Sequence, residues 1–179
     1  MTTRDLPPAA ADERFALDDG TEVLLRAIRP DDARIEQQFV RRLSPRSRQL
    51  RFLSGIKELS PALLTKFTHT DYPAEAAFIA TIDCNGQEQQ IGVARFATGS
   101  SDDSREFAVV VADEWQGRGI ATALLRKLFR VAIHAGSHAI EGLVLQENAR
   151  MLELARDFGF EIRSYAADPA LVVVRKQLS

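Results

Sequence analysis

Apolar residues recur along this chain with two spacings, one typical of β-strands and one typical of α-helices. Short apolar or alternating runs bounded by turn residues predict strands at residues 22–28, 76–83, 90–97, 105–111, 139–145, 161–165 and 171–175. Runs with helical spacing and helix-start residues predict helices at residues 30–43, 46–53, 61–68, 119–135 and 148–158. This order predicts an α+β fold, in which a mixed β-sheet is flanked by helices.

The length and composition predict one globular domain with a short tail. Residues 1–16 contain Pro7-Pro8 and an alanine run, which predicts a flexible N-terminal tail, and residues 17–179 then form a single domain. Apolar residues make up 45% of the chain and charged residues 27%, as in an ordinary globular protein. The formal net charge of −2 argues against broad binding of nucleic acid, which requires a basic surface.

Several classes of site are not indicated by the sequence. Cys84 is the only cysteine, so no intrachain disulfide and no cysteine-ligated metal site can form within one chain. The three histidines show no ligand spacing, and we therefore predict no metal. We find neither a signal peptide nor a run of about 18 apolar residues, so we expect a cytoplasmic protein that does not bind membranes.

The most specific local pattern is Gln116-Gly117-Arg118-Gly119-Ile120-Ala121, between the strand at 105–111 and the helix at 119–135. In such a turn the backbone N–H groups lack helical acceptors, and the helix dipole adds partial positive charge. Glycines remove side chains that would keep a phosphate from these donors. A P-loop is excluded because no Gly-Lys-Ser or Gly-Lys-Thr follows, and a dinucleotide fingerprint lacks its third small residue. The pattern predicts a phosphate or pyrophosphate site.

Three segments resemble the GNAT superfamily of N-acetyltransferases. Gln-x-x-Gly-x-Ala between a strand and a long helix resembles the acetyl-CoA-binding motif of that family. Residues 148–160 resemble the family's Asn-led helix that ends in Gly-Phe, and residues 25–32 resemble its first strand and helix start. The resemblance covers about residues 20–176. It implies a mostly antiparallel mixed sheet with helices on both faces, and acetyl-CoA as the acyl donor.

The resemblance also implies which residues bind acetyl-CoA. The pyrophosphate would lie on backbone amides of the glycine turn, and the pantetheine arm would pair with the strand before it. A backbone N–H near Val111 would then stabilise the oxyanion of the attacked thioester. Arg118 either contacts a phosphate or is a solvated surface residue, and Asn148 caps its helix or also reaches the pantetheine. The implied residues are Val109, Val110, Val111, Gln116, Gly117, Arg118, Gly119, Ile120, Ala121, Thr122 and Asn148.

Glu106 is the candidate general base. A lysine ammonium, with a pKa of about 10.4, must lose a proton before it attacks a thioester. The resemblance implies that Glu106 takes this proton, commonly through water, although a strand-end carboxylate can also simply face water or pair with Arg105. Glu141 on the neighbouring strand is the reserve candidate. The family's tyrosine that protonates the leaving thiolate is replaced by Ala155, but a thiol pKa of about 8.5 lets thiolate leave without it.

The acceptor is indicated by a narrower resemblance. Residues 41–52, 71–80 and 106–111 are similar to bacterial protein lysine acetyltransferases of the Pat type. This implies direct attack by a protein lysine, for example on an acyl-CoA synthetase, in a ternary complex with a monomeric or homodimeric enzyme. Five arginines between Arg41 and Arg51 either dock an acidic protein surface or form a solvated helix face.

Two other functions remain open from the sequence. The first is a small-amine acetyltransferase that acts on polyamines or antibiotics. A polyamine would prefer an acidic cleft, which Asp31, Asp32, Asp102 and Asp103 are the candidates to supply. The second is a non-catalytic domain that senses acyl-CoA and binds a partner protein. An acyl donor longer than acetyl is compatible with either.

Overall fold

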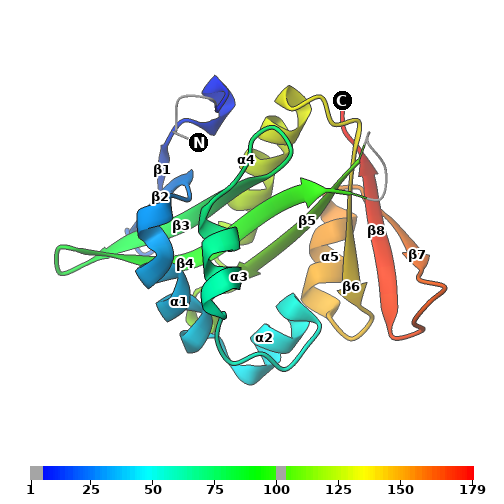
Figure 1. Cartoon of the computed structure of the whole chain (residues 1–179), viewed down its shortest axis with the longest axis horizontal. Coiled ribbons are helices and arrows are strands. Elements are labelled where there is room, and N and C mark those ends of the chain that lie inside the picture. The colour runs from blue at the N-terminus through cyan, green and yellow to red at the C-terminus, as the bar shows by residue number, and fades with distance from the viewer. Residues whose placement is uncertain (1–5, 100–103) are drawn as a thin grey trace.

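The computed structural model describes residues 6–99 and 104–179, whose strands form one sheet with helices on both faces (Figure 1). The strands are β1 (Glu13–Ala16), β2 (Glu22–Ala27), β3 (Ala76–Cys84), β4 (Gln87–Thr98), β5 (Ser104–Val111), β6 (Ala139–Leu145), β7 (Glu161–Ser164) and β8 (Leu171–Gln177). Their order in the eight-stranded sheet is β1-β2-β3-β4-β5-β6-β8-β7. Only β5 and β6 pair in parallel; the other neighbours are antiparallel. The predicted α+β fold with a mostly antiparallel mixed sheet is therefore confirmed.

The helices begin where the sequence places helix-start residues. They are α1 (Ala33–Arg42), α2 (Pro45–Phe52), α3 (Pro61–Thr68), α4 (Ile120–His134) and α5 (Ala149–Asp157), with short 3₁₀ turns η2 (Pro8–Ala10), η3 (Pro30–Asp32) and η4 (Asp113–Trp115). Ser44 and Ser60 each accept a hydrogen bond from the backbone N–H three residues later, and a proline follows each of them. These N-caps start α2 and α3.

Two hydrophobic layers separate the helices from the sheet. Because side chains alternate across a strand, β3 presents Phe78 to one face and Ile79 to the other. α4 and α5 pack on the Phe78 face together with Phe96 and Phe107, while α1, α2 and α3 cover the Ile79 face. Figure 1 shows α1, α2 and α3 on the viewer's side of the sheet and α4 behind it.

The prediction of a flexible tail over residues 1–16 is wrong for the described part of that segment. Glu13–Ala16 forms β1 and pairs with β2, and Ala10 is buried. Lys127 of α4 is fully buried, and its ammonium donates to the backbone carbonyl of Ala11 and, at 2.9 Å, to Glu13 Oε1. A buried ammonium requires such partners, so α4 fixes the segment in place. Residues 1–5 lie outside the described residues.

β5 and β6 diverge after a short parallel contact. Their register runs only from Ser104 opposite Ala139 to Glu106 opposite Glu141, although β5 continues to Val111 and β6 to Leu145. Figure 1 shows the two strands meeting at one end and separating toward α2 and α5. The second half of β5 therefore has an open edge toward β6.

The N–H groups on this open edge can be assigned from the ladder with β4. Ala112 N donates to Ile91 O at 2.8 Å, and Gly99 N donates to Ser104 O at 3.1 Å. Because hydrogen-bonded pairs alternate along an antiparallel ladder, the N–H groups of Val109 and Val111 point away from β4. They face the gap between β5 and β6.

Over residues 6–99 and 104–179, no helix is long and apolar enough to cross a membrane.

Candidate active site

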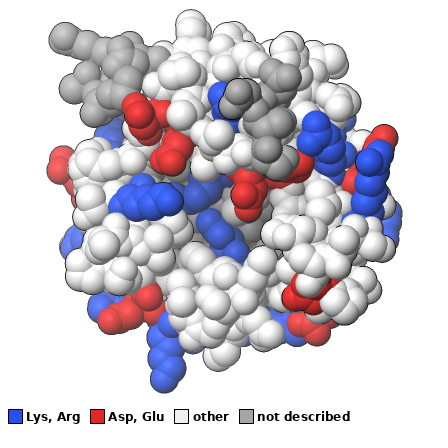
Figure 2. Space-filling view, turned by 45° about the vertical axis from the view of Figure 1, so that its right-hand side comes forward, with Lys and Arg blue, Asp and Glu red and all other residues white. Residues whose placement is uncertain are grey.

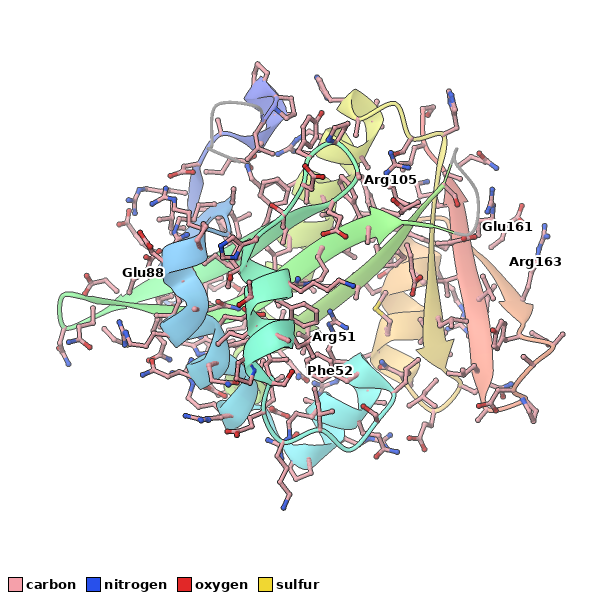
Figure 3. All side chains as sticks on the ribbon, in the orientation of Figure 1. Arg51, Phe52, Glu88, Arg105, Glu161 and Arg163 are labelled. Atoms are coloured by element: carbon pink, nitrogen blue, oxygen red, sulfur yellow. The ribbon has the colours of Figure 1, made fainter. Side chains whose placement is uncertain are left out.

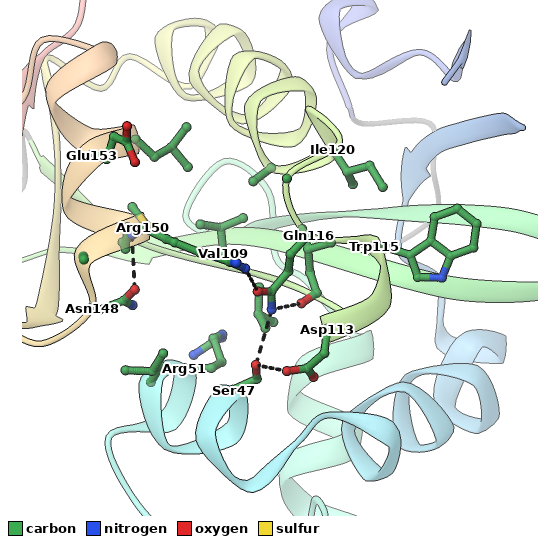
Figure 4. Close-up of a pocket in the computed structure, with 18 of the residues that line it drawn as sticks. Ser47, Arg51, Val109, Asp113, Trp115, Gln116, Ile120, Asn148, Arg150 and Glu153 are labelled. Carbon is green, nitrogen blue, oxygen red and sulfur yellow. Dashed lines mark hydrogen bonds between the residues drawn. The ribbon is translucent and has the colours of Figure 1, made fainter. Parts of the chain in front are cut away.

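A cavity of about 660 Å³ opens where β5 and β6 diverge (Figure 4). It is lined by the end of β5, the glycine turn, the start of α4, one side of α2, and the β6–α5 connection with α5. Ten of the sequence-predicted residues line it: Val109, Val110, Val111, Gln116, Gly117, Gly119, Ile120, Ala121, Thr122 and Asn148. Glu106 and Arg118 do not. The structure therefore brings two distant segments together at one site, as the motifs predict.

The glycine turn presents backbone donors to this cavity. Gly117 and Gly119 have φ of +75° and +82°, which a side chain would strain, although an added Cβ would meet no atom within 4 Å at either position. Gly119 is the N-cap residue of α4, but it has no side chain that could accept a hydrogen bond from the first backbone N–H groups of the helix. The first N–H to reach a helical acceptor belongs to Ala123, which bonds Gly119 O at 3.0 Å. The preceding amides of Ile120, Ala121 and Thr122 are therefore oriented for an anion.

Gln116 holds the glycine turn to its surroundings. Its side-chain Nε2 donates to Val111 O at 3.0 Å and to Ser47 Oγ at 3.3 Å, and its Oε1 accepts from Arg150 at 2.6 Å. These bonds join β5, α2 and α5 around the cavity (Figure 4). The Gln116 amide therefore acts on the site through protein contacts, and its predicted contact with the coenzyme stays a prediction.

Arg118 turns away from the cavity. Its guanidinium forms an ion pair with Asp19 at 2.8 Å and lies 4.9 Å from the Trp115 ring. It lines a separate depression between β1 and α4. Of the two roles considered for Arg118, this position favours the surface residue with a local partner.

Asn148 has the position of a helix cap at the edge of the cavity. Its side-chain oxygen accepts from Met151 N at 3.2 Å, which starts α5. The residues of α5 that follow on the cavity side are Arg150, Met151, Glu153, Leu154 and Asp157. Ala155, which replaces the tyrosine of the resembled family, is 1% exposed and packs in the core. Tyr165 follows β7 and does not line the cavity.

Asp113 is a cavity residue that the sequence analysis missed. Its carboxylate accepts hydrogen bonds from Ser44 N at 2.9 Å, Ser44 Oγ at 2.7 Å and Ser47 Oγ at 2.8 Å. Burial raises the pKa of Asp113, but the bonds from Ser44 and Ser47 outweigh this effect and leave the pKa below its usual value. The carboxylate thus fixes the N-terminus of α2 to the turn after β5. Its partners are more than 60 residues away in sequence, so no local pattern reveals it.

We expect Asp113→Ala to loosen this junction. Loss of the bonds to the α2 N-terminus should lower the free energy of unfolding by about 1–2 kcal/mol, measured by urea titration. The KM for acetyl-CoA should also rise, because Ser47 then no longer supports Gln116. Glu114→Ala, which removes the adjacent exposed carboxylate, is the matched control and should change neither value. Equal values for Asp113→Ala and the control would contradict this role.

Glu106 lies at the point where β5 and β6 still pair. It is exposed and stands opposite Glu141 in the parallel register, so both carboxylates are on the α2 side of the sheet. Glu141 is held by Arg175, whose guanidinium donates to Oε2 at 2.8 Å. Glu106 does not line the cavity, so we expect it to take the amine proton through a water molecule if it is the base. Its catalytic role stays a prediction.

Four of the five arginines between Arg41 and Arg51 have local partners. These are Arg41 with Glu58 at 2.7 Å, Arg42 with Gln90 O at 2.7 Å, Arg46 with Glu147 at 2.8 Å, and Arg48 with Leu43 O at 2.5 Å. They stabilise α1, α2 and their neighbours. Arg51 differs, because it lines the cavity without a hydrogen bond or ion pair to a described residue.

Comparison with known proteins matches this chain to acetyltransferases. The family described as Acetyltransferase (GNAT) family matches residues 46–160. An acetyltransferase of Pseudomonas aeruginosa is 37% identical over 163 residues, which are 91% of this chain and 88% of that protein. The family match includes the glycine turn and α5 with its cap Asn148.

Solved structures share the whole fold. The GNAT domain of Streptomyces lividans PAT superposes with a TM-score of 0.85 at 26% identity and covers 97% of this chain and 100% of that one. A spermidine N-acetyltransferase from Vibrio cholerae, solved with CoA and spermine, has a TM-score of 0.65 at 20% identity and covers 87% and 95% of the two chains. At 20% identity, the likeness to the spermidine N-acetyltransferase shows a shared fold and no more.

Proposed function

The chain belongs to the Acetyltransferase (GNAT) family and uses acetyl-CoA as its donor, and we propose that its acceptor is a lysine of a protein. This acceptor is supported by the resemblance of residues 41–52, 71–80 and 106–111 to the Pat type, and the likeness to the GNAT domain of PAT over 97% of this chain agrees with it. An acyl-CoA synthetase is the first protein to test, because the 41–52 segment resembles the Pat type. The proposed location is the cytoplasm.

The single observation that carries the chemistry is the divergence of β5 from β6. The pantetheine arm would enter the gap and pair with the N–H groups of Val109 and Val111. Its pyrophosphate would reach the amides at the start of α4. The thioester oxygen would then face the Val111 N–H, and removing one such donor typically slows acyl transfer by about 10²–10³-fold.

The amine would attack from the side of the sheet that α2 covers. Glu106 is on this face, whereas α4 and α5 occupy the other. We propose direct attack in a ternary complex. The amine nitrogen forms a bond to the thioester carbon, Glu106 accepts the amine proton through water, and the carbon–sulfur bond then breaks to release CoA as thiolate.

A polyamine acceptor is not supported by the aspartates considered for it. The acidic cleft considered for it depends on four aspartates. Asp32 is bound to Arg26, Asp31 does not line the cavity, and Asp102 and Asp103 lie outside the described residues. Among the acidic residues that do line the cavity, Asp113 is bonded to Ser44 and Ser47 and Glu147 is paired with Arg46.

The test is an acceptor panel. Purified enzyme and acetyl-CoA are incubated with an acyl-CoA synthetase, spermidine, spermine or an aminoglycoside, and the release of CoA thiol is followed. Mass spectrometry then locates acetyl groups on protein lysines. We expect the protein to have the highest kcat/KM. Transfer to the polyamines alone would favour the small-amine function, and tight binding of acetyl-CoA without transfer to any acceptor would favour a sensor domain.

A further inference from the structure

Arg51 is a cavity residue whose charge has no direct partner within the described part of the chain. It lies at the C-terminal end of α2, is partly buried, and extends into the cavity from the same helix as Ser47 (Figure 4). Neither a hydrogen bond nor an ion pair to a described residue reaches its guanidinium. Its contacts are the faces of Phe52 and Phe67, with the guanidinium carbon 4.9 Å and 6.0 Å from the ring centroids. The other cavity arginines, Arg46 and Arg150, are bound to protein groups.

A second guanidinium lies against the same aromatic ring. Arg95 of β4 is 3.9 Å from the Phe67 centroid and is held by Glu36 at 3.3 Å and by Phe67 O at 3.2 Å. Burial, and then the charge of Arg95, lower the pKa of Arg51 to about 9, against the opposing influence of Glu36 and Glu106. Arg51 is still a cation at neutral pH. The Arg51 and Arg95 guanidinium groups thus lie on the same aromatic ring, and of these two only Arg95 forms an ion pair with a described residue. An anion bound next to Arg51 would reduce the repulsion between the two cations.

The surface view is consistent with this arrangement. The face in Figure 2 is hollowed near its centre, and Lys and Arg atoms lie in the hollow with Asp and Glu atoms beside it. Figure 3 places Arg51 between α2 and the central strands. α2, which carries Arg51, packs on β5, which carries Glu106, and Arg51 lines the cavity on this side of the sheet. An amine that attacks from the α2 side therefore approaches Arg51 as well.

This proximity constrains the acceptor. A protonated amine is repelled by the Arg51 guanidinium unless a negative group accompanies it. A carboxylate matches the guanidinium fork with two parallel hydrogen bonds, which a point charge cannot do. The preferred acceptor is thus an amine that carries a carboxylate a few ångström away.

We propose that Arg51 binds a carboxylate of the acceptor and so selects which amine is acetylated. The inference rests on the proposed function only in placing the amine beside Glu106. Two sources have this chemistry: an acidic side chain next to a lysine in a protein, and the α-carboxylate of a free amino acid. Arg95 does not line the cavity and acts as a positioning residue, which keeps a second positive charge behind Arg51.

Two matched pairs of acceptors separate the sources. The first pair is a blocked peptide with one lysine next to aspartate, and the same peptide with asparagine. The second pair is free lysine and 1,5-diaminopentane, which differ by the carboxylate alone. Initial rates are measured at saturating acetyl-CoA with wild type, Arg51→Gln, Arg51→Lys and Arg41→Gln. Arg41 is exposed and paired with Glu58 outside the cavity, so Arg41→Gln is the charge-matched control.

In at least one of the two acceptor pairs, the wild type should have a higher kcat/KM for the member that carries the carboxylate. Arg51→Gln should lose this preference. Its kcat/KM for the carboxylate member should fall by about 100-fold, with a small change for the neutral member. Arg51→Lys should lie between, because its ammonium lacks the planar fork. Arg41→Gln should match wild type. Calorimetry should show that all four proteins still bind acetyl-CoA, which shows that the site is folded.

The contrary outcomes are distinct. Equal losses on both members of each pair would overturn the inference, since that is what a packing role for Arg51 predicts. A preference that survives in Arg51→Gln, or wild type without any preference, would overturn it too. The rates are also measured with succinyl-CoA as donor, and a loss in Arg51→Gln that appears only with this donor would overturn the inference, because Arg51 would then bind the carboxylate of the donor. Dependence on Arg51 in the free lysine pair, with no peptide acetylated, would overturn the protein lysine function while this inference stands.

Discussion

Replacing Glu106 with glutamine should lower kcat at neutral pH by about 10²–10⁴-fold, because an amide cannot accept the proton of the attacking amine. The Kd of acetyl-CoA should stay close to that of wild type, since Glu106 does not line the cavity in which the donor would bind. Steady-state rates of CoA release and calorimetry measure the two quantities. Raising the pH should restore part of the rate, because a lysine amine with a pKa of about 10.4 then loses its proton without help.

The neighbouring carboxylate provides the sharpest comparison. Glu141 stands opposite Glu106 in the register but is bound to Arg175 at 2.8 Å and is less exposed. A carboxylate held by a guanidinium is a weaker base, so Glu141→Gln should reduce kcat less than Glu106→Gln does. If Glu141→Gln has the larger effect, the base is Glu141.

A remote carboxylate completes the set of variants. Glu161 is exposed on β7, at the edge of the sheet away from the cavity (Figure 3). Glu161→Gln changes the same net charge and should leave kcat unchanged. If kcat of Glu106→Gln equals that of Glu161→Gln, Glu106 has no catalytic role, and the amine loses its proton to solvent before it binds.

Features encoded by neighbouring residues were predicted well from the sequence. The cap Ser60 acts within three residues, and the glycine turn depends on backbone conformation over Gly117–Gly119. The order of strands and helices follows from the same local signals. Ten of the twelve predicted site residues line one cavity because they come from the two motifs that flank the β5–β6 gap.

Features that depend on contacts between residues far apart in the sequence were not predictable. Asp113 bonds Ser47, and Lys127 bonds Glu13 over a separation of 114 residues, so no spacing rule connects them. The tail prediction was wrong for this reason. The sequence showed five arginines in one segment, but only the fold distinguishes Arg51 from those bound to protein groups.

Arg26→Leu should be the most destabilising of the predicted changes. Arg26 is 3% exposed, and its guanidinium bonds Asp32 through two contacts of 2.7 Å and Glu88 through two of 2.8 Å. The leucine would leave the buried Asp32 carboxylate without its counter-ion. We expect the free energy of unfolding to fall by about 3–5 kcal/mol and Tm by roughly 10–15 °C, measured by urea and thermal unfolding.

The pH dependence of the free energy of unfolding tests whether lost ion pairs destabilise Arg26→Leu. The hydrogen bonds from Arg26, and to a smaller extent the one from Thr81, lower the pKa of Glu88 against the opposing effect of burial. A lowered folded-state pKa contributes stability above the unfolded pKa of about 4.3, and this contribution is lost as the pH falls through the folded value. Wild type should therefore lose more stability below about pH 4 than Arg26→Leu does, since the variant has already lost the interaction.

The exposed pair on β7 shows what burial adds. Arg163 bonds Glu161 at 2.6 Å, a shorter contact than any that Arg26 makes, but both side chains are more than half exposed. Because water screens such a pair, Arg163→Leu should change the free energy of unfolding by less than about 1 kcal/mol. Asp32 also accepts the Arg29 N–H at 2.7 Å, so Arg26→Leu combined with Asp32→Leu should recover only part of the loss. Equal effects of Arg26→Leu and Arg163→Leu would mean that the buried cluster contributes no more than a surface ion pair.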